Sequence, residues 1–168
     1  MEGARRRVGR YGATMSDYNK YYSDMLKKGL EFQDVVTREL YQRGIVIVGY
    51  ASQKYQNEAG ENMLGAEIKH DMKFKDTGNL YIEVAEKSHP DKPDYTPSGI
   101  YRKDNSWLYV IGNEEEIYIF STKILRMIEG KFFHPEPTPT SKGFLIPTVD
   151  AEKYCIRKID LRVRPGDD

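Results

Sequence analysis

The stretch LGAEIKHDMKFKDTGNLYIEVAEK, residues 64–87, decides the predicted fold. Two runs within it alternate apolar and charged side chains, as half-buried strands do, because successive residues of a strand face opposite sides of the sheet. Asp76-Thr77-Gly78 lies between the runs and suits a three-residue hairpin loop with glycine in the left-handed position. The sequence therefore predicts an antiparallel hairpin of residues 64–74 and 79–87.

The register of this hairpin determines which charged side chains meet. With a three-residue loop, one face carries three opposed pairs, which are Asp71 with Glu83, Lys69 with Ala85, and Glu67 with Lys87. Two opposed carboxylates repel each other, so the Asp71–Glu83 pair predicts a cation between them. Mg²⁺ prefers a few carboxylate oxygens and keeps several waters. Lys69 could then orient a metal-bound water or neutralise charge on a phosphate.

Two alternatives to this metal site remain open. A solvated hairpin face with cross-strand salt bridges explains the same charges, since charged strand faces are common. A two-residue turn would instead put Asp71 and Glu83 on opposite faces of the hairpin. His70 alternates with these acids, so we expect it to pack on the other face.

The segments around the hairpin predict an α+β domain, an α/β sandwich with one mixed sheet flanked by helices. Apolar periodicity predicts helix over 15–43, with Gly29 as a point where it divides into two. Strands are expected at 45–48, 107–111, 117–120 and 153–164, and a short helix from Ser121 or Thr122 to Ile128. Loops are expected at 52–63, 88–98 and 134–143.

Composition bounds the class of protein. The 168 residues fit one ordinary domain, which we expect over residues 15–168. Lys and Arg (26) balance Asp and Glu (26), which excludes a strongly basic, histone-like binder. One Cys and three widely spaced His argue against zinc and leave carboxylates as the expected metal ligands. No apolar run approaches the roughly 20 residues that span a bilayer, so we expect a cytoplasmic protein without a membrane partner.

Residues 1–14 are basic and rich in glycine. The segment contains only one acidic residue and four arginines, which are Arg5, Arg6, Arg7 and Arg10. The segment predicts a flexible basic arm, either a solvated tail or an arm that contacts nucleic acid. Lys103 and Lys142, in expected loops, are further candidates for contacts with phosphate.

Together the hairpin and its neighbours resemble the PD-(D/E)XK nuclease superfamily. That superfamily has a core of helix, three-stranded antiparallel sheet, helix and further strand, with an acid on one hairpin strand and Glu-x-Lys on the next. The matching segments are 65–71 and 79–85 for the two strands, 29–32 for the leading helix, and 97–100, 107–110 and 117–128 for later parts of restriction-endonuclease-like and phage-type members. The likeness covers about residues 24–130, by topology more than by strict motif.

The resemblance implies a Mg²⁺-dependent deoxyribonuclease, with Mn²⁺ as a substitute ion and DNA as the substrate. Asp71 and Glu83 would hold the metal, helped by Glu67 or by Glu31 of the leading helix, with Asp34 as the alternative to Glu31. A homodimer is a candidate assembly, because a small enzyme with a single site cuts two strands most simply as a pair.

One position departs from the pattern. Ala85 stands where the superfamily has its lysine. Lys69 from the neighbouring strand or Lys87 further along could replace it, and we favour Asp71, Glu83 and Lys69 as the catalytic set. Glu67-Ile68-Lys69 could instead be the Glu-x-Lys motif itself, and its partner acid would then be Glu58 or Glu61. The departure also leaves open a catalytically inactive nuclease-like module that binds nucleic acid or a protein partner.

Overall fold

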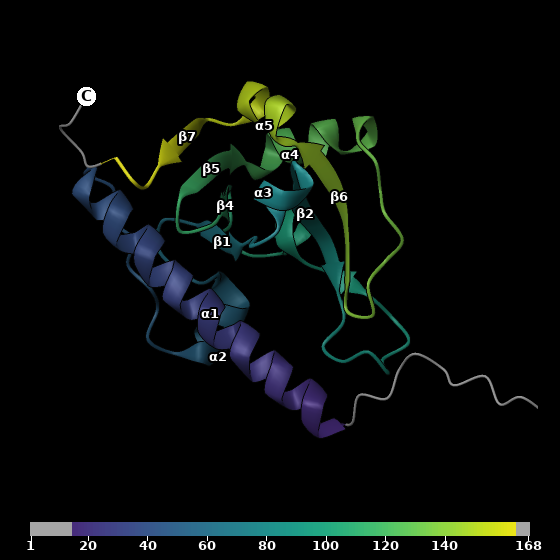
Figure 1. Ribbon diagram of the computed structural model, residues 1–168. Coiled ribbons are helices and arrows are strands. Elements are labelled where there is room, and N and C mark those ends of the chain that lie inside the picture. Colours follow the sequence, from purple (N-terminus) through teal and green to yellow (C-terminus); the bar gives the residue numbers. More distant parts are fainter. Residues whose placement is uncertain (1–14, 164–168) are drawn as a thin grey trace, which may run out of the picture.

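A long helix and two β-sheets make up the described part of the chain, residues 15–163, in a computed structural model (Figure 1). The elements are α1 (Met15–Gln42), α2 (Gln53–Ala59), β1 (Ala66–His70), α3 (Phe74–Thr77), β2 (Asn79–Glu86), β3 (Thr96–Pro97), η1 (Gly99–Tyr101), β4 (Leu108–Gly112), β5 (Glu116–Ser121), α4 (Thr122–Ile128), η2 (Glu129–Lys131), β6 (Ser141–Pro147), α5 (Thr148–Tyr154) and β7 (Arg157–Asp160). The arrangement confirms the predicted α+β class. The predicted basic arm at 1–14, with Arg5, Arg6 and Arg7, lies outside the described residues.

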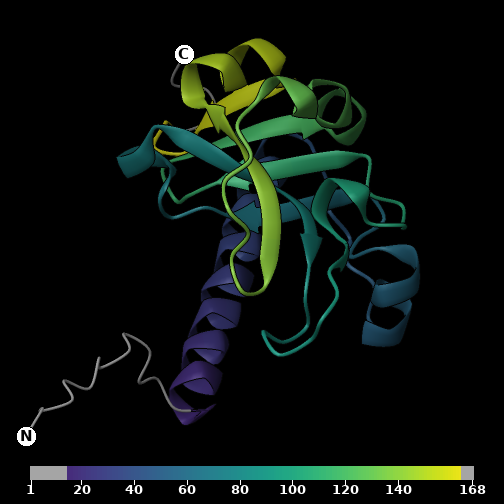
Figure 2. The same ribbon diagram turned by 90° about the vertical axis from the view of Figure 1, so that its right-hand side faces the viewer.

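Helix α1 confirms the predicted N-terminal helix and runs through Gly29 without a break. Its second half buries Phe32, Val36 and Leu40, which recur with helical spacing and pack on one sheet. The first half extends away from the sheets (Figure 2) and exposes Leu26. Within residues 15–163, no helix is both long and apolar enough to cross a membrane.

The four-stranded sheet, in the order β1-β4-β5-β7, forms the middle layer. Strand β1 pairs parallel with β4, while β4–β5 and β5–β7 are antiparallel. Strand β4 is apolar along its whole length because both faces are buried. Leu108 and Val110 face α1, whereas Tyr109 and Ile111 belong to the core on the other side.

A second, three-stranded antiparallel sheet in the order β3-β2-β6 covers that other side. Leu80 and Ile82 of β2 and Phe144 and Ile146 of β6 pack with the aromatic side chains of β4 and β5. The protein therefore has three layers, with α1 on one face of the middle sheet and the second sheet on the other. The expectation of a single mixed sheet was wrong.

The predicted hairpin of residues 64–74 and 79–87 was also wrong, although both of its strands exist. The chain leaves β1 at His70 and forms the short helix α3, which buries Phe74 in the core. Gly78 adopts the left-handed conformation expected of a turn glycine, but it ends this helix instead of closing a hairpin. The segment between β1 and β2 thus crosses from one sheet to the other, and no ladder joins the two strands.

Three other segments differ from expectation. Residues 45–48 form no strand, and Val46 is 58% exposed. The expected loop 52–63 contains α2, and the expected loop 134–143 includes the first residues of β6. Within residues 153–163, only Arg157–Asp160 forms a strand, and Lys153 and Tyr154 belong to the helix Thr148–Tyr154. Strands β4 and β5 and helix α4 lie where they were predicted.

Candidate functional site

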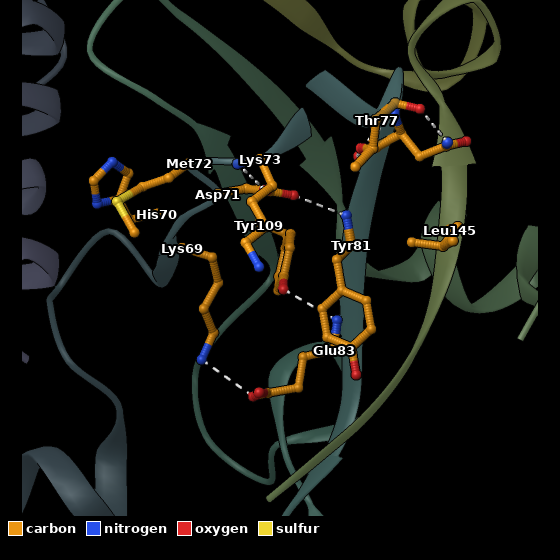
Figure 3. A pocket seen from close by; sticks show the side chains of 11 residues that line it. Lys69, His70, Asp71, Met72, Lys73, Thr77, Tyr81, Glu83, Tyr109 and Leu145 are labelled. Carbon is orange, nitrogen blue, oxygen red and sulfur yellow. Dashed lines mark hydrogen bonds and ion pairs between the residues drawn. The ribbon is translucent and has the colours of Figure 1, made fainter. Parts of the chain in front are cut away.

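A cavity of about 430 Å³ opens between the two sheets, at the end of β1 and along β2. It is lined by Lys69, His70, Asp71, Met72, Lys73, Thr77, Asn79, Tyr81, Glu83, Tyr109 and Leu145. Figure 3 shows Lys69, Asp71 and Glu83 on its walls. The three residues favoured as the catalytic set therefore line one cavity, even though the hairpin that was expected to join them does not form.

Lys69 connects the two sheets electrostatically. Its Nζ lies 2.9 Å from Glu67 Oε1 and 3.2 Å from Glu83 Oε1. Because side chains alternate between the two faces of a strand, residues 67 and 69 lie on the same face of β1, the face toward β2. Burial lowers the pKa of Lys69, but the carboxylates of Glu67 and Glu83 outweigh this effect and raise the pKa well above its usual range. Lys69 is therefore a permanent cation on the cavity wall.

Glu83 is held by hydroxyl groups from two distant segments. Ser98 Oγ donates to Glu83 Oε1 at 2.8 Å, and Ser141 Oγ donates to Oε2 at 3.2 Å. The backbone N–H of Glu83 donates to the Tyr109 hydroxyl at 3.3 Å. Burial raises the pKa of Tyr109, so this phenol stays neutral. The carboxylate is thus fixed in one orientation at the floor of the cavity.

The Asp71 carboxylate is turned toward the backbone. Its Oδ1 accepts from the N–H of Lys73 at 3.0 Å, and its Oδ2 accepts from the N–H of Tyr81 at 3.0 Å. Asp71 and Glu83 consequently point at different partners (Figure 3), which contradicts the direct pairing that the hairpin register predicted. Each Asp71 oxygen still has a second lone pair that can accept another ligand.

A second charged cluster lies behind Glu67, which is almost fully buried. Arg102 Nη1 lies 3.3 Å from Glu61 and 3.5 Å from Glu67, and its Nε lies 2.9 Å from Asp104. Burial raises the pKa of Glu61, and the negative charge of Glu67 adds to that effect. Of the two acids considered as partners for Glu67-Ile68-Lys69, Glu61 joins this cluster, whereas Glu58 is exposed on α2.

Glu31 and Lys87 lie outside the cavity, whereas His70 lines its edge. Glu31 is exposed on α1 and lies 3.8 Å from Lys27, so the structure does not bring it to the other acids. Lys87 lies over the ring of Tyr95, beyond the end of β2. His70 stacks on Phe32 with ring centroids 4.5 Å apart, which confirms the packing role expected for it.

Sequence reasoning did not predict the roles of four residues that hold this site, namely Ser98, Arg102, Tyr109 and Ser141, although Arg102 and Ser141 were considered as contacts to phosphate. Tyr109 was assigned to a strand, but nothing in the sequence shows which way its hydroxyl points. Ser98 and Ser141 lie in segments expected to be loops, and only the tertiary fold brings them to Glu83. Lys103 and Lys142, the predicted phosphate contacts, line a separate cavity.

A hard divalent cation is the group that the resemblance implies here, and one or two carboxylates suffice because Mg²⁺ keeps several waters. Asp71 and Glu83 have lone pairs left, whereas Glu67 Oε1 is already engaged by Lys69 Nζ at 2.9 Å. Within residues 15–163, however, no three His, Cys, Asp or Glu side chains lie close enough to hold a metal ion among themselves. The donors fit a hydrated ion with few protein ligands and do not fit a closed cage.

Comparisons of this chain with models of known protein families, with curated proteins and with solved structures found no match. The function is therefore inferred from the residues and geometry of the cavity and from the resemblance seen in the sequence.

Proposed function

We propose that this protein is a Mg²⁺-dependent deoxyribonuclease that hydrolyses phosphodiester bonds of DNA in the cavity between β1 and β2. The observation that carries the proposal is that Lys69, Asp71 and Glu83 line that one cavity. Lys69 lies on β1, Asp71 directly follows β1, and Glu83 lies on β2 of the other sheet, so their meeting is a property of the tertiary fold. A cation and two carboxylates around a cavity are the groups that phosphodiester hydrolysis uses.

Asp71 and Glu83 would hold the metal ion through the carboxylate lone pairs that their present hydrogen bonds leave unused. When bound, the ion would act as a Lewis acid on the phosphate and acidify a water molecule. Ser98 and Ser141 keep the Glu83 carboxylate oriented by donating to its two oxygens. The two backbone N–H groups on Asp71 do the same for that carboxylate.

Lys69 contributes a fixed positive charge beside Glu83. Its elevated pKa keeps the ammonium protonated, so it cannot serve as a general base near neutral pH. It can instead stabilise the negative charge that grows on the phosphate oxygens and the leaving oxygen during hydrolysis. Lys69 thus takes the part that the superfamily gives to the lysine missing at Ala85.

The test is a cleavage assay of single-stranded, duplex and branched DNA with Mg²⁺ or Mn²⁺. The wild type should cleave at least one of these substrates, and Asp71→Asn and Glu83→Gln should each lower the rate at least 100-fold. Glu136→Gln removes an exposed carboxylate outside the cavity and serves as the matched control, with an unchanged rate. Absence of cleavage of every substrate by the wild type, or full activity in both variants, would refute the proposal.

A catalytically inactive module that binds nucleic acid is the second candidate. The observation in its favour is that Lys69 already neutralises Glu83, while Ala85 leaves the motif position without a lysine. Such a module would bind DNA without cutting it and would bind no metal ion. Glu83→Gln would leave its affinity for DNA unchanged. The cleavage assay combined with a binding measurement separates the two candidates.

A further inference from the structure

A second cavity of about 430 Å³ lies beside β2, past the irregular pairing between Glu83 and Ala85. The following side chains line it, from five separate segments: Val84, Ala85, Tyr95, Pro97, Tyr101, Lys103, Glu129 and Lys142. It adjoins the first cavity at two places. Pro97 lines it while the next residue, Ser98, donates to Glu83, and Lys142 lines it while the preceding Ser141 also donates to Glu83.

Positive charge gathers on one aromatic ring at this cavity. The Nζ atoms of Lys87 and Lys142 lie 4.4 Å and 4.3 Å from the centroid of Tyr95. The ring attracts each ammonium, but the two ammonium groups repel each other. In the described part of the chain, no ion pair joins a carboxylate to Lys87, Lys103 or Lys142. Lys142 lines this cavity, whereas Lys87 lines a different one and is related to this cavity through its contact with Tyr95. An anion bound beside Tyr95 would be attracted by both ammonium groups.

The rest of the cavity wall is apolar and aromatic. Val84 and Pro97 contribute aliphatic surface, and Tyr101 contributes a ring whose hydroxyl donates to Glu129 at 2.6 Å. The one carboxylate on the wall is therefore already engaged by a neutral phenol. Lysines above an apolar wall are the features that recognise a nucleotide, with phosphate on the ammonium groups and the base on carbon surface.

We infer that this second cavity binds one unpaired nucleotide of a DNA strand, with its phosphate beside Tyr95, where Lys142 and Lys87 supply positive charge. The inference rests on the proposed function and deepens it, because it makes single-stranded or frayed DNA the substrate class. The volume suits a single nucleotide and cannot enclose a base pair with its two backbones. Since Glu83 neighbours both cavities through Ser98 and Ser141, the bound strand continues toward the proposed catalytic carboxylates.

The test is fluorescence anisotropy with a labelled thymidine 15-mer, measured in EDTA so that no cleavage occurs. The double variant Lys87→Gln/Lys142→Gln should bind about tenfold more weakly than the wild type. Its affinity should also depend less on salt, with a logarithmic slope shallower by about 0.7 for each phosphate that the lysines no longer neutralise. Lys123→Gln, at an exposed position on α4, is the matched control and should bind like the wild type.

Each other outcome is assigned in advance. Equal binding by the double variant, with an unchanged melting temperature, would overturn the inference. Equal weakening for a blunt 15-base-pair duplex would overturn the requirement for an unpaired nucleotide. Displacement of the 15-mer by equimolar thymidine monophosphate would overturn the assignment to a strand and indicate a free nucleotide.

Failure of the proposed nuclease activity and failure of nucleotide binding give different experimental results. Glu83→Gln should abolish cleavage and leave the affinity for the 15-mer in EDTA unchanged. A wild type that never cleaves but loses affinity through the double variant would refute the nuclease and support the nucleotide cavity. A wild type that cleaves DNA, together with a double variant that binds the 15-mer normally, would support the nuclease and refute the nucleotide cavity.

Discussion

Lys69 forms ion pairs with two carboxylates that the fold brings together, those of Glu67 and Glu83. Glu67 is nearly inaccessible to solvent, and Glu83 comes from the other sheet. Removing the ammonium would leave both carboxylates without their shared cation, and an uncompensated buried charge costs several kcal/mol. Each charge in this cluster is therefore tied to the presence of the others.

Replacing Lys69 by Met should lower the free energy of unfolding by about 3 kcal/mol at pH 7, because Glu83 loses its counter-charge and Glu67 keeps only Arg102. Urea titration of the variant and the wild type measures the loss. Adding Glu67→Gln to Lys69→Met should recover part of it, since the second change removes the buried negative charge. A loss below about 0.5 kcal/mol would contradict the stabilising role given to Lys69.

Glu116 on β5 predicts a pH dependence. It lies 3.1 Å from Lys75 and 3.3 Å from Lys158. Burial alone would raise its pKa, but hydrogen bonds from the two lysines outweigh burial and lower it. Because the folded-state pKa is below the unfolded value of about 4.3, the stabilisation is complete above that value and is lost as the pH falls through the folded-state pKa.

Glu116→Gln should therefore cost about 2 kcal/mol at pH 7 and much less once the pH falls below the folded-state pKa, where the wild-type carboxyl is protonated in both states. Denaturant titrations at several pH values give the difference. A difference that stays constant from pH 7 down to the acid limit of folding would show that the charge of Glu116 does not act as described.

At the scale of elements, the short helix η1 packs directly on β2 and presents Ser98 to Glu83. Gly99 makes this approach feasible. Its φ is +52°, and a Cβ there would lie 2.3 Å from the backbone oxygen of Glu83. Only glycine satisfies both requirements at once.

Gly99→Ala should lower the free energy of unfolding by about 2 kcal/mol or more, because η1 must move off β2. Gly29→Ala is its control, since a Cβ at this helical position meets nothing within 4 Å. That control should raise stability by about 0.5–1 kcal/mol. Thermal melting compares the two, and equal melting temperatures would contradict the packing of η1.

The elements that could be predicted are those whose local pattern and tertiary role agree. Helix α1 has sustained apolar periodicity, and strands β4 and β5 are long apolar runs between acidic and polar turns. The pairing of β1 and β2 could not be predicted, because the Asp76-Thr77-Gly78 sequence suits the end of a helix as well as a hairpin. The core position of Phe74 decides for the helix end and against the hairpin. That core position depends on strands that are distant in the sequence.

For the whole molecule, the balance of 26 basic and 26 acidic residues reflects internal pairing as well as surface charge. Arg102 and Lys69 are each bound to acids in the interior of the fold. Lys87, Lys103 and Lys142 have no carboxylate partner within residues 15–163. Lys103 and Lys142 line the second cavity, and Lys87 lies over the ring of Tyr95, which also lines it. The net charge of zero thus leaves a local basic region available for phosphate.

Three of the predicted site residues line one cavity, but Glu31, Glu67 and Lys87 do not, and the geometry was not predicted. Asp71, Glu83 and Lys69 were selected because carboxylates and a lysine alternate on adjacent strands, and they do line one cavity. The expected register of β1 against β2 was wrong, because β2 pairs with β6, whereas β1 pairs with β4. The hydroxyl donors to Glu83 arrive from residues 98 and 141, beyond the reach of local patterns.

The central claim is that the carboxylates of Asp71 and Glu83 bind a divalent cation in the cavity between the two sheets. Titration calorimetry with Mn²⁺ tests it directly, because Mn²⁺ prefers the same oxygen ligands as Mg²⁺. The wild type and Glu136→Gln should take up Mn²⁺ with equal affinity, and Glu83→Gln should weaken uptake at least tenfold. Absence of Mn²⁺ uptake by the wild type, or equal uptake by Glu83→Gln, would contradict the account.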